Sequence, residues 1–170
     1  CAKAAQKNAE GMINPGDEIN GMVFTTTDEI DWDLSLAFIC DFESIEETDA
    51  SPTIACFASP GSSVFFGNFS GVPYNNPKEA DEPWKEITSE VTFDGQPLYL
   101  PAFGYMEIEL SGAEWKFARI WNLMVNNITP GTHTILTKWE EADEIQTNTY
   151  IFTIVDKQET YSTLSTKVTS

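Results

Sequence analysis

Apolar side chains alternate with polar ones along most of this chain, and that period of two predicts β-strands with one buried face. The clearest alternating stretches are residues 34–42, 84–93, 105–110, 115–125 and 150–154. Shorter apolar runs occur at 19–26, 53–57 and 63–69, and Ile135 and Trp139 mark one further strand. The sequence therefore predicts about nine strands, and no segment shows a sustained helical period.

The breaks between these stretches carry residues that favour tight turns. Asp94-Gly95 is a strong signal for a short hairpin, and Pro130-Gly131 fits a type II turn. Many short strands separated by turns predict an all-β fold, an antiparallel β-sandwich at residues 14–156. Residues 1–13 are predicted to be a tether, 157–170 a polar tail, and 67–83 a long loop inside the sandwich.

Residues 129–156 combine a Pro-Gly-Thr-His turn with two alternating strands. This segment resembles the closing hairpin of bacterial immunoglobulin-like domains. The resemblance implies an immunoglobulin-like sandwich, but fold alone carries no function. Cys40 and Cys56 depart from the antibody pattern, because they lie early in the chain with no tryptophan between them.

Two internal cysteines indicate that the protein is exported from the cytoplasm. Cys40 and Cys56 have fifteen residues between them, each in a short apolar stretch, so two neighbouring strands could bring their sulfurs together. A disulfide closing a loop of that size stabilises a fold by about 3 kcal/mol and is typical of exported proteins. The alternative is two buried free thiols. A zinc site is disfavoured, because no Cys-x-x-Cys occurs and His133 is the single histidine.

Cys1 stands before a short tether of small and polar residues. This arrangement resembles a mature bacterial surface lipoprotein, in which the terminal cysteine carries the lipid. The resemblance implies lipidation of Cys1 and a lipid anchor to a membrane. The alternative is a chain boundary that falls at a cysteine by chance.

The net charge of the chain excludes one class of partner. The chain has 27 acidic and 9 basic residues, a formal net charge of −18 at pH 7. Such a surface repels phosphate backbones, so nucleic acid is not an expected partner. The acidic excess favours solubility, cation binding, or a salty or acidic habitat, and the alternative is simply a solvated surface.

The stretch 28–33 concentrates carboxylates. Asp28, Asp31 and Asp33 could supply oxygen ligands to Ca²⁺, although the glycine and distal glutamate of an EF-hand are missing. The alternative is a solvated turn, and no other cofactor is predicted.

Aromatic residues near the predicted loops suggest a second kind of site. Trp32, Tyr74 and Trp84 could stack on a glycan, or Trp32 and Trp84 could instead anchor loops over the edge of the core. Asn68 and Asn127 each begin an Asn-x-Ser/Thr acceptor for N-glycosylation.

No known catalytic motif is present, and His133 follows a Pro-Gly turn, where a structural role is expected. We therefore predict a non-catalytic cell-surface or extracellular module. Its expected partners are other copies of itself or cell-surface components, joined into a fibre or layer when a terminal segment adds to a sheet edge. The alternative is a carbohydrate- or calcium-binding surface lipoprotein.

Overall fold

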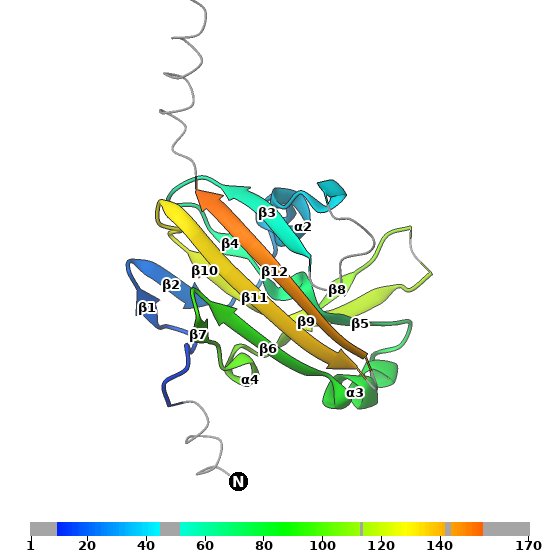
Figure 1. The fold of residues 1–170 in the computed structure, drawn as a ribbon. Coiled ribbons are helices and arrows are strands. Elements are labelled where there is room, and N and C mark those ends of the chain that lie inside the picture. Colours follow the sequence, from blue (N-terminus) through cyan, green and yellow to red (C-terminus); the bar gives the residue numbers. More distant parts are fainter. Residues whose placement is uncertain (1–9, 45–51, 113, 142–143, 155–170) are drawn as a thin grey trace, which may run out of the picture.

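The computed structural model describes residues 10–44, 52–112, 114–141 and 144–154. One layer is a five-stranded sheet that runs across the molecule (Figure 1). In spatial order its strands are β3 (Thr53–Ala58), β12 (Glu144–Ile154), β11 (Gly131–Glu141), β6 (Thr88–Phe93) and β7 (Gln96–Pro97).

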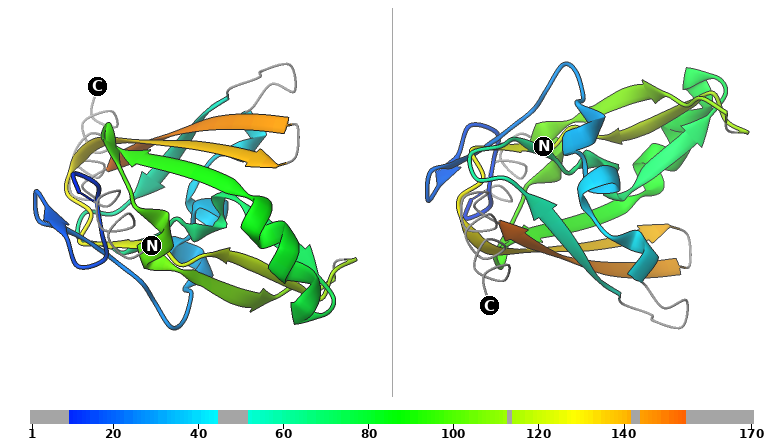
Figure 2. Two further views of the ribbon diagram at one scale, coloured as in Figure 1. Left: turned by 90° about the horizontal axis from the view of Figure 1, so that it is seen from below. Right: turned by 90° about the horizontal axis from the view of Figure 1, so that it is seen from above.

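Two smaller sheets form the opposite layer (Figure 2). The four-stranded sheet has the order β1 (Glu18–Ile19), β2 (Met22–Thr25), β10 (Met124–Asn126) and β4 (Val64–Phe65). The three-stranded sheet has the order β5 (Gly71–Tyr74), β9 (Phe117–Trp121) and β8 (Tyr105–Glu109). The short helices are η1 (Trp32–Leu34), α2 (Leu36–Ile39), η2 (Phe42–Ser44), η3 (Gly67–Phe69), α3 (Pro77–Glu86) and α4 (Leu100–Phe103).

The core lies between the five-stranded and four-stranded sheets. Phe93 and Phe152 project from the first, and Phe24 projects from the second, each at most 3% exposed. The ring of Phe66 packs edge to face on Phe152 at 5.2 Å between centroids, and Phe24 packs in the same way on Phe93 at 5.2 Å. Edge-to-face pairs of this kind add to the stabilisation from burial itself.

The predicted all-β sandwich class is confirmed. Asp94 and Gly95 both have positive φ (49° and 82°) and form the hairpin between β6 and β7. The long hairpin of β11 and β12 runs in register from Gly131 opposite Ile154. One feature departs from a purely antiparallel sheet, because β3 pairs with β12 in parallel.

The predicted disulfide between Cys40 and Cys56 is present. It ties the end of α2 to β3, and the backbone beside it is also linked, since Asp41 N donates to Ala55 O at 2.8 Å.

The strand predicted at 34–42 is wrong, because this stretch forms η1, α2 and η2. Asp31 starts the first turn, since its carboxylate accepts a hydrogen bond from the backbone of Asp33. Leu36 and Cys40 are four residues apart and both buried, whereas Phe38 is 65% exposed. Apolar residues at every second position include pairs four apart, and these also fit one helical face.

The long strand predicted at 115–125 is two strands in different sheets, β9 and β10. The chain leaves the three-stranded sheet at Asn122, whose backbone N–H donates to Gly104 O at 3.0 Å. Trp115, the first residue of that predicted strand, lies before β9 and is 39% exposed.

The predicted loop at 67–83 instead contains η3, β5 and most of α3, which also takes residues 84–86 from the strand predicted at 84–93. The helix begins where a cap and a proline coincide. The side chain of Asn76 accepts a hydrogen bond from Lys78 N at 3.2 Å, and Pro77 occupies the first helical position. Ala80 is fully buried against the three-stranded sheet.

The sandwich includes residues that the sequence assigned to the tether. Ile13 is fully buried and bridges to Leu98, with Ile13 N donating to Pro97 O at 2.8 Å. The predicted tail at 157–170 and most of the tether lie outside the described residues.

Candidate functional site

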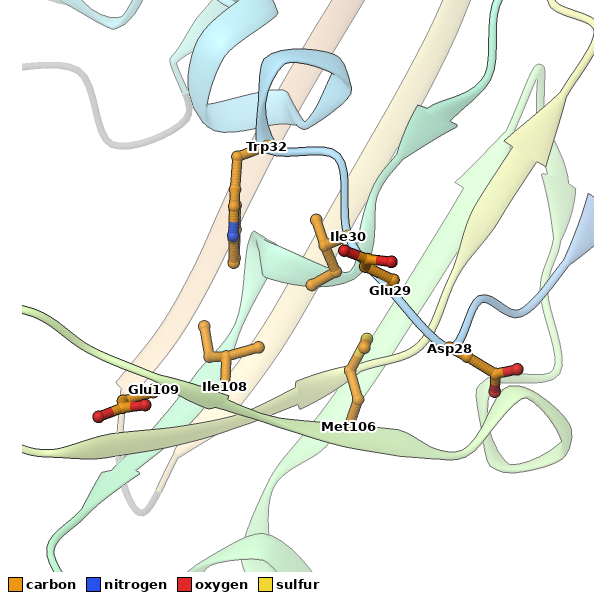
Figure 3. A pocket seen from close by; sticks show the side chains of 7 residues that line it. All are labelled: Asp28, Glu29, Ile30, Trp32, Met106, Ile108 and Glu109. Carbon is orange, nitrogen blue, oxygen red and sulfur yellow. The ribbon is translucent and has the colours of Figure 1, made fainter.

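A shallow hollow of about 420 Å³ lies between the segment before η1 and strand β8 (Figure 3). We call it the Trp32 hollow, and its lining residues are Asp28, Glu29, Ile30, Trp32, Met106, Ile108 and Glu109. The apolar side chains come from both elements and lie between exposed carboxylates. Trp32 is 37% exposed, so part of its ring is available to a ligand.

Asn122 fixes the segment that forms one wall of this hollow. Its side chain accepts a hydrogen bond from Thr27 N and donates one to Thr27 O, both at 2.9 Å. Thr27 Oγ1 in turn donates to Glu29 O at 2.6 Å. At the far end, Ser35 Oγ donates to Trp32 O at 2.8 Å. The wall therefore has a defined conformation without belonging to a strand.

The structure does not bring the predicted calcium ligands together. Asp28 lines the hollow, whereas Asp31 caps η1 and Asp33 is a residue of η1. All three are exposed, and within the described part of the chain no three His, Cys, Asp or Glu side chains are grouped to hold a metal.

Of the three predicted stacking residues, only Trp32 lies at the hollow. Tyr74 is 1% exposed and stacks on Phe117 at 5.7 Å, so it is not available to a ligand. Trp84 is half-buried on α3 and packs against Trp121 at 4.7 Å and Tyr105 at 5.5 Å. The Trp84 ring thus anchors α3 to the three-stranded sheet, and the Tyr74 ring packs within that sheet.

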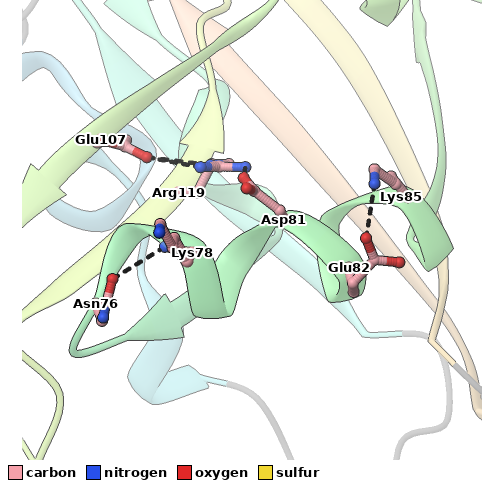
Figure 4. Close-up of polar contacts among 7 residues, drawn as sticks. All are labelled: Asn76, Lys78, Asp81, Glu82, Lys85, Glu107 and Arg119. Carbon is pink, nitrogen blue, oxygen red and sulfur yellow. Dashed lines mark hydrogen bonds and ion pairs between the residues drawn. The ribbon is translucent and has the colours of Figure 1, made fainter.

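The sequence did not single out Arg119, the one arginine of the chain (Figure 4). Its side chain is 6% exposed, and it holds a carboxylate on each side. Nη2 donates to Glu107 Oε1 at 2.8 Å, and Nη1 donates to Asp81 Oδ1 at 3.0 Å. The guanidinium also lies over the Tyr105 ring, 4.3 Å from its centroid. This network ties α3 and β8 to β9.

Two pKa values respond to this environment. Burial lowers the pKa of Arg119, but the hydrogen bonds to Glu107 and Asp81 outweigh that effect and the net pKa is raised. Burial, followed by a hydrogen bond to Glu107, raises the pKa of Tyr74 to about 12. Both groups keep their usual charge near neutral pH, so the network is structural rather than poised for proton transfer.

His133 has a structural environment, as its position after the turn predicted. The ring is buried, with Nδ1 2.8 Å from Asp94 Oδ2 and Nε2 2.9 Å from Thr129 O. The other oxygen of Asp94 accepts a hydrogen bond from Thr134 N at 2.8 Å. His133 therefore joins the Asp94-Gly95 hairpin to the entry of β11.

The predicted modification sites differ in exposure. Asn127 is exposed, but its amide nitrogen donates to Gly21 O at 2.7 Å. Asn68 lies in η3, and its side-chain oxygen is buried. The Asn127 amide nitrogen is thus already bonded to the backbone, and the Asn68 side chain is half-buried. Cys1, the predicted lipidation site, lies outside the described residues.

A second hollow, which we call the β6 groove, has a volume of about 580 Å³. Its lining residues are Met12, Thr88, Ser89, Glu90, Val91, Thr92, Pro97, Leu98, Tyr99, Leu100 and Pro101. The groove exists because β7 pairs only with Thr92 and Phe93, after which the chain turns away into α4. One further bond, from Leu98 N to Val91 O at 2.9 Å, continues the ladder.

A scan against protein-family models and searches of curated proteins and solved structures find no match to this chain. Within the described ranges, no helix has the length and apolar character needed to span a bilayer. The site must therefore be interpreted from its own chemistry.

Proposed function

We propose that this chain is a non-catalytic module of the cell surface or extracellular space whose copies join end to end. In this proposal, residues 157–170 of one copy add as a strand in the β6 groove of the next. The supporting observation is that β6 is paired along its full length by β11 on one side but only at its end by β7. The resemblance to surface lipoproteins with immunoglobulin-like domains agrees with this location.

The groove has the chemistry of a strand-addition site. On the side of β6 that faces β7, no strand of the described residues pairs with Thr88–Glu90, the first half of β6. Exposed strand edges accept extended segments through backbone hydrogen bonds, and adjacent pockets take alternate side chains. Leu98 and Leu100 line the groove, with at most 4% of each residue exposed.

The segment 157–170 has a composition that suits this groove. Leu164 and Val168 lie at the same parity, so both would face one side of an added strand. The segment has two lysines and one glutamate, a side-chain charge of +1 on a chain of net charge −18. Attraction between this segment and another copy is therefore favoured over repulsion.

The sheet register favours a neighbouring copy as the acceptor. Ile154 pairs with Gly131 at one end of β11, whereas Thr88 pairs near the other end, with Glu140. Ile154, the last described residue, thus lies at the end of the sheet away from Thr88. Head-to-tail contacts of this kind generate open fibres when the rotation between copies does not close into a ring.

Deletion of residues 157–170 tests the proposal. We expect the full chain to form particles that grow with protein concentration, measured by light scattering and electron microscopy, and the deletion variant to stay monomeric with an unchanged melting temperature. A second variant blocks the acceptor. Because Val91 O faces the groove, Ser89 N–H faces it as well, so Ser89→Pro removes a groove-side donor and leaves the β11 ladder intact.

A matched pair of variants separates side-chain recognition from length. Leu164→Ser with Val168→Ser should weaken assembly, whereas Thr163→Ser with Thr169→Ser, at the opposite parity, should not. Assembly that survives both the deletion and the Ser89→Pro variant would show that the copies join elsewhere. A full chain that stays monomeric at every concentration would refute assembly altogether.

The alternative function, carbohydrate or calcium binding, is supported only by Trp32, since the three aspartates are not grouped. The ligand titrations described in the next section test that alternative as well.

A further inference from the structure

We infer that the Trp32 hollow binds the side chain of a lysine or arginine presented by a partner protein. This inference does not depend on assembly through the β6 groove, because the hollow lies on the other layer, beside β8. It rests on three features of the hollow together: its apolar floor, its exposed indole and the sign of the charges around it.

The rim of the hollow is acidic. Asp28, Glu29 and Glu109 are exposed lining residues, and none of the seven lining residues is basic. Figure 3 shows the three carboxylates spread around the apolar side chains rather than gathered at one point. A metal ion needs several oxygens within one coordination sphere, and this separation does not offer them. A cation on a long, flexible side chain can approach such a rim.

The floor suits the stem of that side chain. Ile30, Met106 and Ile108 are half-buried and pack on a cluster that contains Phe65 and Ile120. Lysine and arginine lay their methylene groups along apolar surface while the charged end stays at the polar edge. The floor and the rim therefore match the two parts of one side chain.

Trp32 adds a specific contact. Its ring stands beside Ile30 and Ile108, with one part exposed to the hollow. Tryptophan is the best aromatic partner for a cation, and arginine and lysine are its usual partners in proteins. The hydrogen bonds of Thr27 and Ser35 hold this wall in place, so little ordering is needed when a ligand binds.

The test is a titration of the full chain with hexa-lysine and hexa-arginine peptides, with a neutral glucose hexasaccharide and with CaCl₂. Binding is measured by calorimetry and by the NMR shift of the Trp32 indole N–H, assigned from its loss in Trp32→Phe. We expect the basic peptides to shift that resonance, and the sugar and Ca²⁺ to leave it unchanged. Affinity should fall at least tenfold when ionic strength is raised from about 0.05 to 0.5 M, because exposed charges are screened.

Matched variants distinguish this site from general attraction to an acidic protein. Glu29→Gln with Glu109→Gln should weaken peptide binding about tenfold or more. Glu18→Gln with Glu140→Gln changes the net charge by the same amount at exposed positions away from the hollow, and should weaken binding no more than about twofold.

Three results would overturn the inference. Equal loss of affinity in the two double variants would mean that only net charge attracts the peptide. A shift of the Trp32 resonance by the sugar, with none by the peptides, would assign the hollow to glycans. An unchanged Trp32 resonance with every probe at millimolar concentration would leave the hollow without a ligand of this class.

Discussion

Arg119 offers the sharpest test of what holds the three-stranded sheet and α3 together. We consider Arg119→Met, which keeps most of the side-chain volume and its packing but removes the charge. The guanidinium is 6% exposed, while Asp81 and Glu107 are 56% and 37% exposed. The substitution therefore leaves two carboxylates without their cation, but both can still contact water.

The expected cost follows from these exposures. Removing one partner of a fully buried ion pair costs about 3–5 kcal/mol, and a single hydrogen bond to a charged group contributes about 1.5–3 kcal/mol. Because water partly compensates Asp81 and Glu107, we expect a loss of about 2–4 kcal/mol. For a chain of 170 residues, this lowers the melting temperature by roughly 4–16 °C.

Urea denaturation monitored by tryptophan fluorescence measures this loss, with Lys85→Met as the control. Lys85 also pairs with a carboxylate, Glu82 at 2.7 Å, but both side chains are well exposed. The control should leave the midpoint unchanged within error. Adding Glu107→Gln to Arg119→Met should recover part of the loss, because it removes one unpaired carboxylate. If Arg119→Met is no less stable than the control, the network does not hold the sheet.

Three further outcomes follow from the same structure. Tyr74 should ionise with a pKa of about 12 in an ultraviolet tyrosinate titration. Because the fold raises this pKa, the contribution of Tyr74 to the free energy of unfolding, about 2–3 kcal/mol, is complete below pH ~10 and is lost between pH ~10 and 12. The prediction is contradicted if the stability of Tyr74→Phe falls equally steeply over that pH range. Reduction of the disulfide, or Cys40→Ser with Cys56→Ala, should lower the free energy of unfolding by about 3 kcal/mol in the same denaturation assay. An unchanged free energy of unfolding after the bond is removed would show that the disulfide does not stabilise the fold. Gly67→Ala should cost more than about 3 kcal/mol, because a Cβ there would overlap the Trp121 carbonyl oxygen, and a normal melting temperature would show that the two segments are not in contact.

The parts of the fold that the sequence predicts are those fixed by local rules. The Asp94-Gly95 turn adopts positive φ at both residues, and the strands after Pro130-Gly131 alternate as expected. The prediction failed where a pattern had two solutions. Leu36 and Cys40 satisfy both a strand face and a helical face, and the chain adopts α2 here, preceded by the η1 turn that Asp31 caps.

Site residues were harder to predict, because they depend on contacts between distant segments. Trp32 was identified from its loop position, but Met106 and Ile108 were assigned to an ordinary strand, and nothing local pairs them with residue 32. Arg119 carried a usable signal. It lies on the same face as Phe117 and Trp121 in β9, and an arginine at a core parity needs acceptors within reach of its guanidinium.

The most informative failure is the strand predicted to run through Asn122. The apolar alternation continues across this residue, so periodicity alone extends the strand into β10. Instead, both polar ends of the Asn122 side chain bond to the backbone of Thr27, and that contact positions the wall of the Trp32 hollow. Asn122 ends the strand although the apolar alternation continues, and the same residue positions the wall of the hollow. Departures from the local sequence pattern are expected at functional sites. If so, Asn122→Ala should disorder Trp32 and weaken binding of the hexa-lysine peptide while the disulfide-linked core stays folded.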